Sequence, residues 1–569
     1  MKNLIFGILI LFGFKILAQE YPQNYFRSPL DIPLFLSGNF GELRSNHFHT
    51  GLDIKTQGIE GQKIYAVADG YISRIKVSPY GYGNALYITH PNGYTSVYGH
   101  LKKYNDRITK HIKENQYKKE SFSIQLFPPP FMFQVKKGEI VAYSGNSGGS
   151  GGPHLHFEIR DTKSEHPINP LFFGFDIKDN VKPDIYALNI FPLNDTSYVN
   201  GTNSQLRLKA TGSNGIYKLY PNKTILLQGE FGFGIETVDR MNGTGNKYGL
   251  HNIKLIKNNE LVFEQQIDEF AFHQGRYINS HIDYFTYAKN RRRVQKSFLQ
   301  PGNKLRIYKN VKEKGIQKIS GNAEYDYQVS DLNGNISTLS FKVEVFDFKK
   351  QNLDQQLKSK AVKYFRYKER NSFVKDNLLI DLPANVLYED IYFEYREEEA
   401  MNGAISPTYW IHNPYTPLHK HITVSIKMPP LDAKIKNKAY IFSTTDGKGK
   451  YAEGGKWNGN HISVKTRSFG GYGVALDTVA PVIKPINIFD GANMRGKWSI
   501  TAVLKDYHSG IDSYRATVDD KWVLMQYDAK NNKLSYYFDE HVGPGKHVFE
   551  LVVKDEVGNR KVYKANFTR

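Results

Sequence analysis

The pattern of apolar and polar residues along the 569-residue chain is typical of a protein built mainly from short β-strands. Runs such as "NALYITH" and "TSVYGHL" alternate apolar with polar residues, which places the apolar side chains on one face of a strand. The "PNG" between these two runs is typical of a tight hairpin turn. One segment, residues 103–121, is instead polar and helical in character, and it ends before the prolines at 128–130. We therefore predict a mostly β protein with a helical insertion at about 103–130.

The chain is too long for a single hydrophobic core, so several domains are expected. Two patterns recur in the same order along it. D-x-V-x-P-x-I occupies residues 179–185 and 477–483, and V-x-D-x-x-G-N occupies 329–335 and 553–559. Between them, "EFGFGI" and "DYHSGI" each place an acidic residue four positions before Gly-Ile. We interpret this order as an internal duplication of one β-sandwich unit.

The predicted domain organisation has an N-terminal domain followed by three β-rich modules. The two repeated units, which resemble bacterial immunoglobulin-like sandwiches, span 180–348 and 481–569, and a β-rich module of unassigned type spans 363–476. The N-terminal domain spans 20–178. The D-x-x-G-N sequences supply Gly or Asn for a turn with positive φ. A calcium site built from their aspartates is the alternative, and a turn is the favoured interpretation.

The first residues have the features of a secretory signal peptide. Lys2 provides a positive start, residues 4–14 form a short apolar run, and Ala18 is a suitable cleavage residue. No later apolar stretch is long enough to span a membrane. The chain has no cysteine, which excludes disulfides, cysteine-ligated zinc and a lipid-modified cysteine at the mature N-terminus. We predict a signal peptide at 1–18 and a mature chain that is exported, periplasmic or envelope-associated, and without a membrane span.

The formal net charge is +20, with lysines spread along the chain. The simplest interpretation is a solvated cationic surface. Nucleic acid is an unsuitable partner for an exported protein, whereas an anionic polymer of the cell envelope matches this charge.

The candidate chemistry lies in the N-terminal domain. "HFHTGLDI" holds His49 and Asp53, "VYGHL" holds His100, and "GGPHLHFEI" holds His154 and His156. Imidazole and carboxylate groups are good zinc ligands. Four residues of extended strand would separate the Cα atoms of the first pair by about 13 Å, so the chain should bend between them. Thr50-Gly51 is where it can bend, and we expect Gly51 to leave space for a metal.

On a strand, His154 and His156 share one face, so both can bind a metal, or one can bind while the other catalyses. An ordinary solvated face is the third interpretation. With His49 and Asp53, one of them completes the three protein ligands of a catalytic zinc, which leaves the other and His100 for acid–base work.

Other histidines are weaker candidates. His47 lacks the Gly-x-Asp spacing that favours its neighbour. His90 fits a hairpin, and the His419–His421 pair has no H-x-x-x-D partner in its own segment. "SGNSGGSGG" is interpreted as a flexible turn, because no Gly-Lys-Ser/Thr follows it.

These four segments, "HFHTGLDI", "VYGHL", "VKKGEIVAYSGNSG" and "GGPHLHFEI", resemble the lysostaphin/LytM-type zinc endopeptidases and occur in that family's order. The resemblance covers about residues 35–172. It implies a small antiparallel β sheet lining a groove, one Zn²⁺ per chain, and peptide bridges of bacterial peptidoglycan as substrate. Transferred to this sequence, it implies that the zinc ligands are His49, Asp53 and His156, and that the catalytic histidines are His100 and His154. The segment 103–133 is longer than the short link usual in the family.

The resulting hypothesis is an exported zinc metalloendopeptidase that hydrolyses peptide cross-links of peptidoglycan. The first alternative is a non-catalytic LytM-type factor that binds the wall or activates another wall hydrolase. A second alternative is an adhesion or scaffold protein, given the three β modules, which are also candidates for binding another envelope protein.

Overall fold

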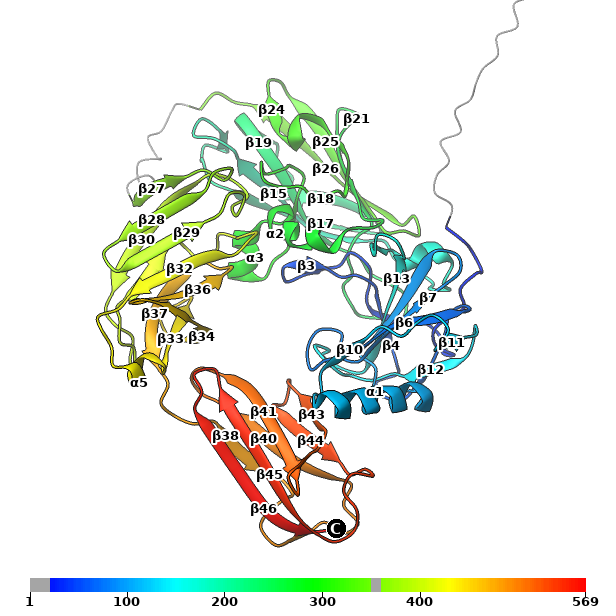
Figure 1. Cartoon of the computed structure of the whole chain (residues 1–569). Coiled ribbons are helices and arrows are strands. Elements are labelled where there is room, and N and C mark those ends of the chain that lie inside the picture. The colour runs from blue at the N-terminus through cyan, green and yellow to red at the C-terminus, as the bar shows by residue number, and fades with distance from the viewer. Residues whose placement is uncertain (1–20, 349–359) are drawn as a thin grey trace, which may run out of the picture.

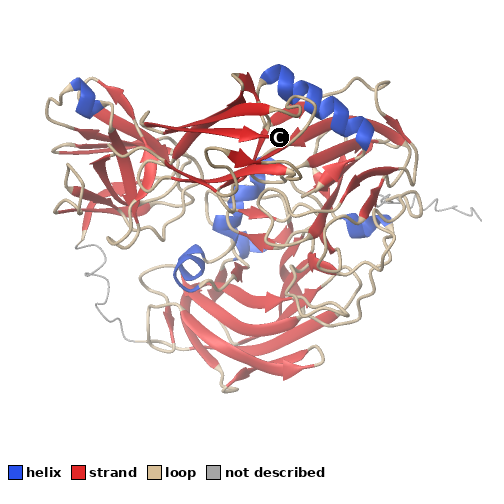
Figure 2. Ribbon diagram, turned by 90° about the horizontal axis from the view of Figure 1, so that it is seen from below, coloured by secondary structure: helices blue, strands red, loops and turns tan. Residues whose placement is uncertain are grey.

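The computed structural model describes residues 21–348 and 360–569, so the predicted signal peptide at 1–18 lies outside the described residues. Strands dominate and helices are few, as Figure 2 shows. The prediction of a mostly β chain, with an N-terminal β-sheet domain followed by several β-sheet modules, is confirmed. In the described residues, none of the helices has the length and apolar character needed to cross a bilayer.

The N-terminal domain is built on a nine-stranded sheet. Seven strands have the order β1-β4-β13-β8-β7-β6-β10, and in addition β11 pairs with β6 and β14 pairs with β13. Successive side chains of β13 point to opposite faces of the sheet, and Leu155 and Phe157 point into a continuous apolar core. The bounds of these strands are β1 (Leu36–Gly38), β4 (Leu52–Lys55), β6 (Gly70–Val77), β7 (Ala85–Thr89), β8 (Tyr94–Gly99), β10 (Ile124–Leu126), β11 (Gln134–Val135), β13 (His154–Asp161) and β14 (Pro167–Ile168).

Smaller elements complete this domain: a three-stranded sheet, a two-stranded hairpin and two helices. They are β5 (Lys63–Tyr65), β12 (Ile140–Tyr143), β9 (Lys103–Tyr104), β2 (Leu43–Arg44), β3 (His47–Phe48), η1 (Pro170–Phe173) and α1 (Asp106–Lys119). Helix α1 begins where the Asn105 side chain accepts a hydrogen bond from the Ile108 amide (3.0 Å), and it ends at Glu120 in the left-handed region. The helix lies inside the predicted insertion at 103–130.

The second module is a twelve-stranded network in which long β19 pairs with β15, β16, β22 and β24 and runs parallel to β26. Its strands are β15 (Asp184–Pro192), β16 (Tyr198–Val199), β17 (Leu206–Ser213), β18 (Ile216–Tyr220), β19 (Ile225–Val238), β20 (Asn252–Lys257), β21 (Glu260–Gln266), β22 (Val294–Lys296), β23 (Tyr308–Val311), β24 (Gln317–Ile319), β25 (Ala323–Ser330) and β26 (Ile336–Val345). The helices are η2 (Phe272–Tyr277), α2 (Ile278–His281), α3 (Tyr284–Asn290) and η3 (Lys312–Gly315). The strand-like pattern of the sequence did not predict the helices at 272–290.

The third module has two sheets, ordered β27-β30-β31-β37-β33-β34 and β28-β29-β32-β36-β35, which share one apolar core. The elements are β27 (Ala361–Phe365), β28 (Asn371–Lys375), β29 (Leu378–Leu382), β30 (Ile391–Glu398), β31 (Thr408–Ile411), β32 (Ile422–Lys427), α5 (Ala433–Lys436), β33 (Ala439–Thr444), β34 (Tyr451–Gly454), β35 (Lys456–Asn458), β36 (His461–Thr466) and β37 (Gly470–Leu476).

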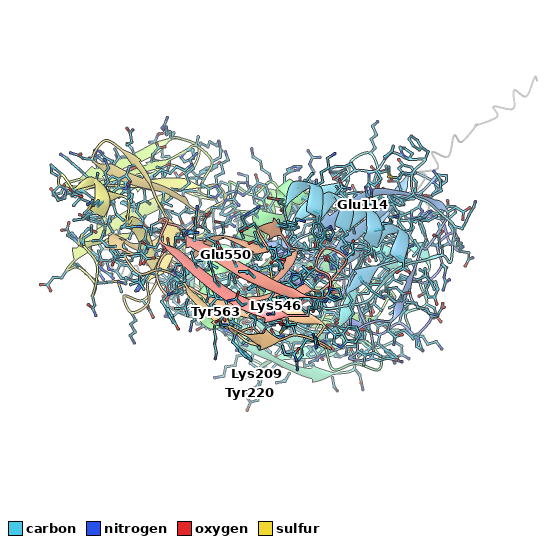
Figure 3. All side chains as sticks on the ribbon, turned by 60° about the horizontal axis from the view of Figure 1, so that its bottom comes forward. Glu114, Lys209, Tyr220, Lys546, Glu550 and Tyr563 are labelled. Atoms are coloured by element: carbon cyan, nitrogen blue, oxygen red, sulfur yellow. The ribbon has the colours of Figure 1, made fainter. Side chains whose placement is uncertain are left out.

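The C-terminal module also packs two sheets over a common core, in the orders β38-β40-β44-β43 and β39-β46-β45-β41-β42. Figure 3 shows Lys546 and Glu550 on β45 and Tyr563 on β46. The strands are β38 (Val482–Pro485), β39 (Ala492–Asn493), β40 (Ser499–Lys505), β41 (Ile511–Val518), β42 (Lys521–Trp522), β43 (Met525–Asp528), β44 (Lys533–Tyr537), β45 (Lys546–Asp555) and β46 (Arg560–Thr568). The immunoglobulin-like class of this module and of the second module stays a prediction.

The four parts of the chain follow one another around a ring, and the C-terminal module returns to α1 (Figure 1). Lys113 of α1 forms an ion pair with Asp539 (3.1 Å), which also accepts a hydrogen bond from Tyr117 (2.6 Å). Lys530 donates to the carbonyl oxygen of Ser150 (3.0 Å), in the Gly-rich turn of the N-terminal domain. The first and last parts of the chain are therefore in direct contact.

The repeated motifs occupy equivalent turns, but one pairing suggested by the sequence is wrong. Gly334 and Gly558 both have positive φ, as the D-x-x-G-N pattern predicted. Glu230, which the pattern aligned with Asp506, lies in the middle of β19. The register instead pairs Asp184 with Val238 and Val482 with Lys505, so the residue equivalent to Asp506 is the one after Val238, Asp239. Both segments have an acidic residue four positions before Gly-Ile, but only by coincidence, since Glu230 lies within a strand and Asp506 follows one.

Candidate metal centre

Two neighbouring strands bring the predicted ligands together. In the antiparallel pair of β4 and β13, Asp53 lies directly opposite His156. His49 precedes β4, and the chain bends at Gly51, as the distance argument predicted. The bend allows Nε2 of His49 to reach within 2.9 Å of Oδ1 of Asp53.

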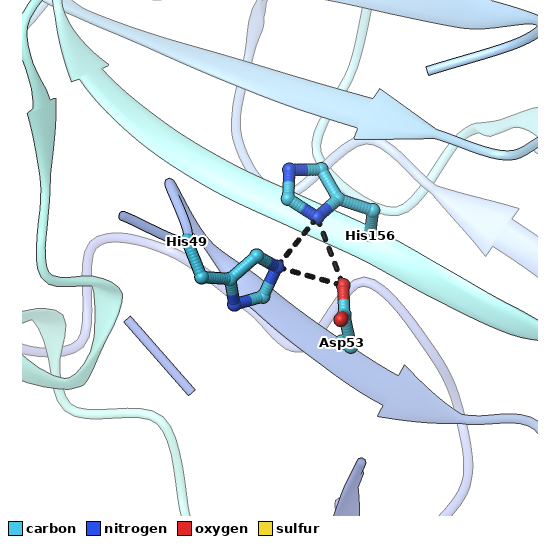
Figure 4. Close-up of side chains that lie close together, drawn as sticks. All are labelled: His49, Asp53 and His156. Carbon is cyan, nitrogen blue, oxygen red and sulfur yellow. Dashed lines mark hydrogen bonds and ion pairs between the residues drawn. The ribbon is translucent and has the colours of Figure 1, made fainter. Parts of the chain in front are cut away.

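Outer hydrogen bonds set the orientation of the two imidazoles. Nδ1 of His49 donates to the Asn39 carbonyl oxygen (2.7 Å), which can only accept, so Nε2 carries the lone pair. Nε2 of His156 donates to the Glu158 carboxylate (2.8 Å), so Nδ1 carries the lone pair. These two nitrogens lie 3.1 Å apart, and each is 2.9 Å from Oδ1 of Asp53 (Figure 4). Three electron-pair donors therefore converge on one point, as in a metal site with its outer partners in place.

Electrostatics favour a cation at this point. Burial acts to raise the pKa of Asp53, but the nearby His49, His154 and His156 outweigh it and hold that pKa well below its usual range. Burial acts to lower the pKa of His156, yet its hydrogen bonds to Asp53 and Glu158 raise that pKa to about 9. Near neutral pH the metal-free ring therefore also holds a proton on Nδ1, directed at Asp53, and it must release that proton to expose the lone pair when a metal binds.

Gly51 has a different role from the one expected. A Cβ at this position would lie 2.2 Å from the carbonyl oxygen of Phe157 and 2.8 Å from Cγ of Glu158. The missing side chain therefore allows β13 to approach the bend and does not provide space for an ion. The expectation of a metal above Gly51 is wrong, because the ligand atoms converge beside Asp53.

The remaining two predicted histidines lie next to this cluster. Nδ1 of His100 donates to the Ser147 carbonyl oxygen (2.8 Å), and Nδ1 of His154 donates to that of Gly152 (2.9 Å), so in the neutral form of each ring Nε2 carries the lone pair. The two ring centroids are 4.8 Å apart. Nε2 of His154 is 3.4 Å from Oδ1 of Asp53, farther than the 2.9 Å of the converging nitrogens. Burial, with the two neighbouring histidines of β13, lowers the pKa of His100 to about 3, which keeps this ring neutral.

A buried network behind His156 was missed by the sequence reasoning. Glu158 is fully buried and accepts hydrogen bonds from Thr50, Tyr82 and Arg160 as well as from His156. Burial acts to raise the pKa of Glu158, but Arg160 and the His156 hydrogen bond hold it well below its usual range. The period of two in "HLHFEIR" places both charged residues on the face of the histidines, so this signal was present in the sequence.

The converging atoms open into a cavity of about 530 Å³. The N-terminal domain supplies most of its lining, including Tyr82, whose ring stacks on His156 with centroids 4.9 Å apart. The second module supplies one wall through Phe270, Phe272 and Gly275. No sequence motif indicated this wall, because its residues come from a segment more than a hundred positions away.

The other histidine candidates lie outside the cluster. His47 is exposed at the edge of the cavity and bonds the Ser45 carbonyl oxygen. Both ring nitrogens of His90 are hydrogen-bonded, and His419 stacks on Tyr277 of the second module. The Gly-rich turn is packed closely against another loop, since Gly149 donates its amide to the Gly81 carbonyl oxygen (2.8 Å).

Comparison with known families identifies two parts of the chain. Residues 47–117 and 133–170 match "Peptidase family M23", and residues 362–477 match "Zu5-like domain". The predicted resemblance of the N-terminal domain to LytM-type peptidases is confirmed. The unmatched residues 118–132 fall mainly within the predicted insertion.

About a fifth of the chain is similar to curated bacterial proteins. It is 31% identical over 129 residues to DD-carboxypeptidase/endopeptidase Mpg of Neisseria meningitidis, covering 23% of each protein. It is 32% identical over 111 residues to peptidoglycan DD-endopeptidase ShyB of Vibrio cholerae, covering 20% of each. It is 35% identical over 122 residues to murein hydrolase activator NlpD of Escherichia coli, covering 21% of this chain and 25% of that protein. The chain thus spans at most about a quarter of the length of these relatives.

Among solved structures, the catalytic domain of the antimicrobial peptidase lysostaphin from Staphylococcus simulans is 25% identical. The match covers 23% of this chain and 86% of that one, with a TM-score of 0.18.

Proposed function

We propose that the N-terminal domain, a domain of Peptidase family M23, is a zinc endopeptidase that hydrolyses peptide cross-links of bacterial peptidoglycan. The observation that carries this proposal is the convergence of three lone pairs, from His49, Asp53 and His156, at distances of 2.9–3.1 Å inside a cavity. Relatives named as DD-endopeptidases support the substrate class.

The donor set fits Zn²⁺. Two imidazole nitrogens and one carboxylate oxygen are the kind of ligand set that catalytic zinc sites use, and three protein ligands leave one position open. Zinc held there would polarise a peptide carbonyl and acidify water toward a pKa of ~7. Glu158 and the Asn39 carbonyl hold the two ligand rings in the tautomers that binding requires.

The protein's own groups supply the proton transfers. His100 and His154 present their Nε2 atoms beside the cluster, and each ring is fixed by a backbone carbonyl at Nδ1. One ring can accept a proton from the attacking water, and the charged form can then donate to the leaving amine or to the developing oxyanion. Phe270 and Phe272 form an apolar part of the cavity wall, against which a peptide would bind.

The proposed target is the direct stem-peptide cross-link in an exported, envelope-associated setting. The predicted signal peptide, the absence of cysteine and the cationic surface all support this location. The test is mass spectrometry of purified cross-linked muropeptides after incubation with the zinc-loaded protein, with Asp53→Ala as the inactive control. Conversion of dimers to monomers is expected. Unchanged dimers with zinc bound would refute the substrate proposal.

The activator NlpD among the relatives favours one competing function, stimulation of another wall hydrolase without hydrolysis. The same assay separates the two functions when a second wall hydrolase is added. An activator leaves muropeptides intact by itself and increases the products of that hydrolase.

A further inference from the structure

Three aspartates meet where the N-terminal domain joins the second module. Asp179 precedes β15, Asp239 follows β19, and Asp331 belongs to the turn between β25 and β26. One carboxylate oxygen from each lies within 4.8 Å of the others. The triad therefore gathers residues from three separate parts of the sequence.

Three oxygens of two of these carboxylates are buried without the partners that buried charges require. Asp239 is fully buried, and neither of its carboxylate oxygens has a hydrogen-bond partner. Oδ2 of Asp179 is also buried without one. Within the described residues no Lys, Arg or His forms an ion pair with any member of the triad, and Arg240 pairs with Asp184 instead (2.9 Å). Unpaired buried carboxylates are costly, so a proton or a cation must compensate them.

Burial and the close approach of the three carboxylates raise the pKa values of Asp239 and Asp179. Burial raises the pKa of Asp239 to about 9, and the charges of Asp179 and Asp331 add to the rise. Burial likewise raises the pKa of Asp179 to about 7, with Asp331 contributing. A bound cation would offset the repulsion between the three carboxylates.

The repeated unit of the C-terminal module contains the equivalent triad, Asp477, Asp506 and Asp555. Here the protein itself supplies partners. Oδ2 of Asp477 accepts from the Ser509 hydroxyl (2.6 Å) and amide (3.1 Å), and Oδ1 of Asp506 accepts from the Gly510 amide (2.8 Å). None of the oxygens of this second triad is found buried and unpartnered among the described residues. The third carboxylates are satisfied alike, Asp331 by Asn335 and Asp555 by Asn559, so the two triads differ at the other two positions.

We propose that Asp179, Asp239 and Asp331 bind a hard divalent cation, with Ca²⁺ as the best match, and that this ion fastens the second module to the N-terminal domain. Oxygen-only donor sets with several carboxylates are typical of Ca²⁺. The segment after Asp239 carries the ion's effect across the junction, since Met241 and Tyr248 pack into the core of the N-terminal domain. Tyr248 also donates its hydroxyl to the Leu36 carbonyl oxygen (2.8 Å) in β1.

The first test is calorimetric titration of the full-length, zinc-loaded chain with CaCl₂ and, separately, with MgCl₂. The wild type and the matched control Asp506→Asn should each bind about one Ca²⁺ at this site. Asp239→Asn should weaken binding at least tenfold, because it removes one of three charged ligands. No Ca²⁺ uptake by the wild type, or equal uptake by Asp239→Asn, would overturn the proposal. Mg²⁺ binding as tight as Ca²⁺ binding would overturn the assignment to calcium.

A second measurement keeps the proposal testable if a variant is unstable. Without Ca²⁺, Asp239→Asn should melt at the same temperature as the wild type or higher, because a neutral amide replaces a carboxyl that must take up a proton or carry an uncompensated buried charge. With Ca²⁺, the order should reverse, since only the wild type gains stability from the ion. An unchanged order of melting temperatures with and without Ca²⁺ would show that the triad holds protons and not a cation.

Discussion

Replacing each histidine of the "HLH" strand separately should divide metal binding from catalysis. Nδ1 of His156 is one of the three converging atoms that can bind the metal, and it lies 2.9 Å from Oδ1 of Asp53. Nε2 of His154 is 3.4 Å from the same oxygen, and its ring is held by the Gly152 carbonyl. We expect His156→Ala to lose zinc and activity together, and His154→Ala to keep zinc and lose turnover.

The magnitudes follow from what each side chain contacts. His154→Ala leaves all three donors in place, so zinc content should stay near one per chain while turnover falls by the ~10²–10⁴-fold typical of a general acid–base group. His156→Ala leaves two donors. Losing only an outer partner typically costs ~10–100-fold in metal affinity, so losing a ligand should cost more than that. The fold should survive, because Glu158 keeps hydrogen bonds from Thr50 and Tyr82.

The assay measures zinc content by mass spectrometry and the rate of muropeptide cleavage on the same preparations. His47→Ala serves as the control for metal content, since this exposed histidine belongs to the same segment but lies outside the cluster. A His154→Ala protein that is folded but empty of zinc would refute the reasoning. It would make His154 a fourth ligand and the site a closed, structural one.

Three further changes test other parts of the structure. Gly51→Ala should lower zinc affinity at least tenfold, because its Cβ would lie 2.2 Å from the Phe157 carbonyl oxygen and force β4 away from β13. Gly151→Ala is the control, since no atom lies near its Cβ. Equal zinc affinities of the two variants would contradict the packing argument. Asp539→Asn should loosen the C-terminal module from α1 and increase the radius of gyration in small-angle X-ray scattering, whereas Asp490→Asn, which affects only a contact within that module, should not. Burial lowers the pKa of Lys296 from 10.5 to about 8, so its charged form destabilises the fold fully below pH 8 and not at all above about pH 10.5. Lys296→Met should therefore raise the free energy of unfolding by about 3 kcal/mol at pH 7. The gain in the free energy of unfolding, measured by urea denaturation, should shrink toward zero at pH 10.5. A gain that stays constant with pH would show that the buried charge of Lys296 is not its cause.

The sequence determined the strand content and the chemistry of the site, because both are written in short-range patterns. Alternation of apolar and polar residues predicted β13, and with it the common face of His154 and His156. The distance between His49 and Asp53 on an extended strand predicted the bend at Gly51. The same period of two contained Glu158, although its role behind His156 required the structure to reveal it.

Only the tertiary structure decided what depends on contacts between distant segments. The opposition of Asp53 and His156 follows from strand register, and the tautomers follow from Asn39 and Glu158, which no local pattern connects. Phe270 and Phe272 reach the cavity because the second module packs against the N-terminal domain. Asp239 joins the aspartate triad through the pairing of β15 with β19, whereas sequence spacing pointed to Glu230. In each case the deciding energy is that of packing and hydrogen bonding across the fold, which local sequence patterns do not contain.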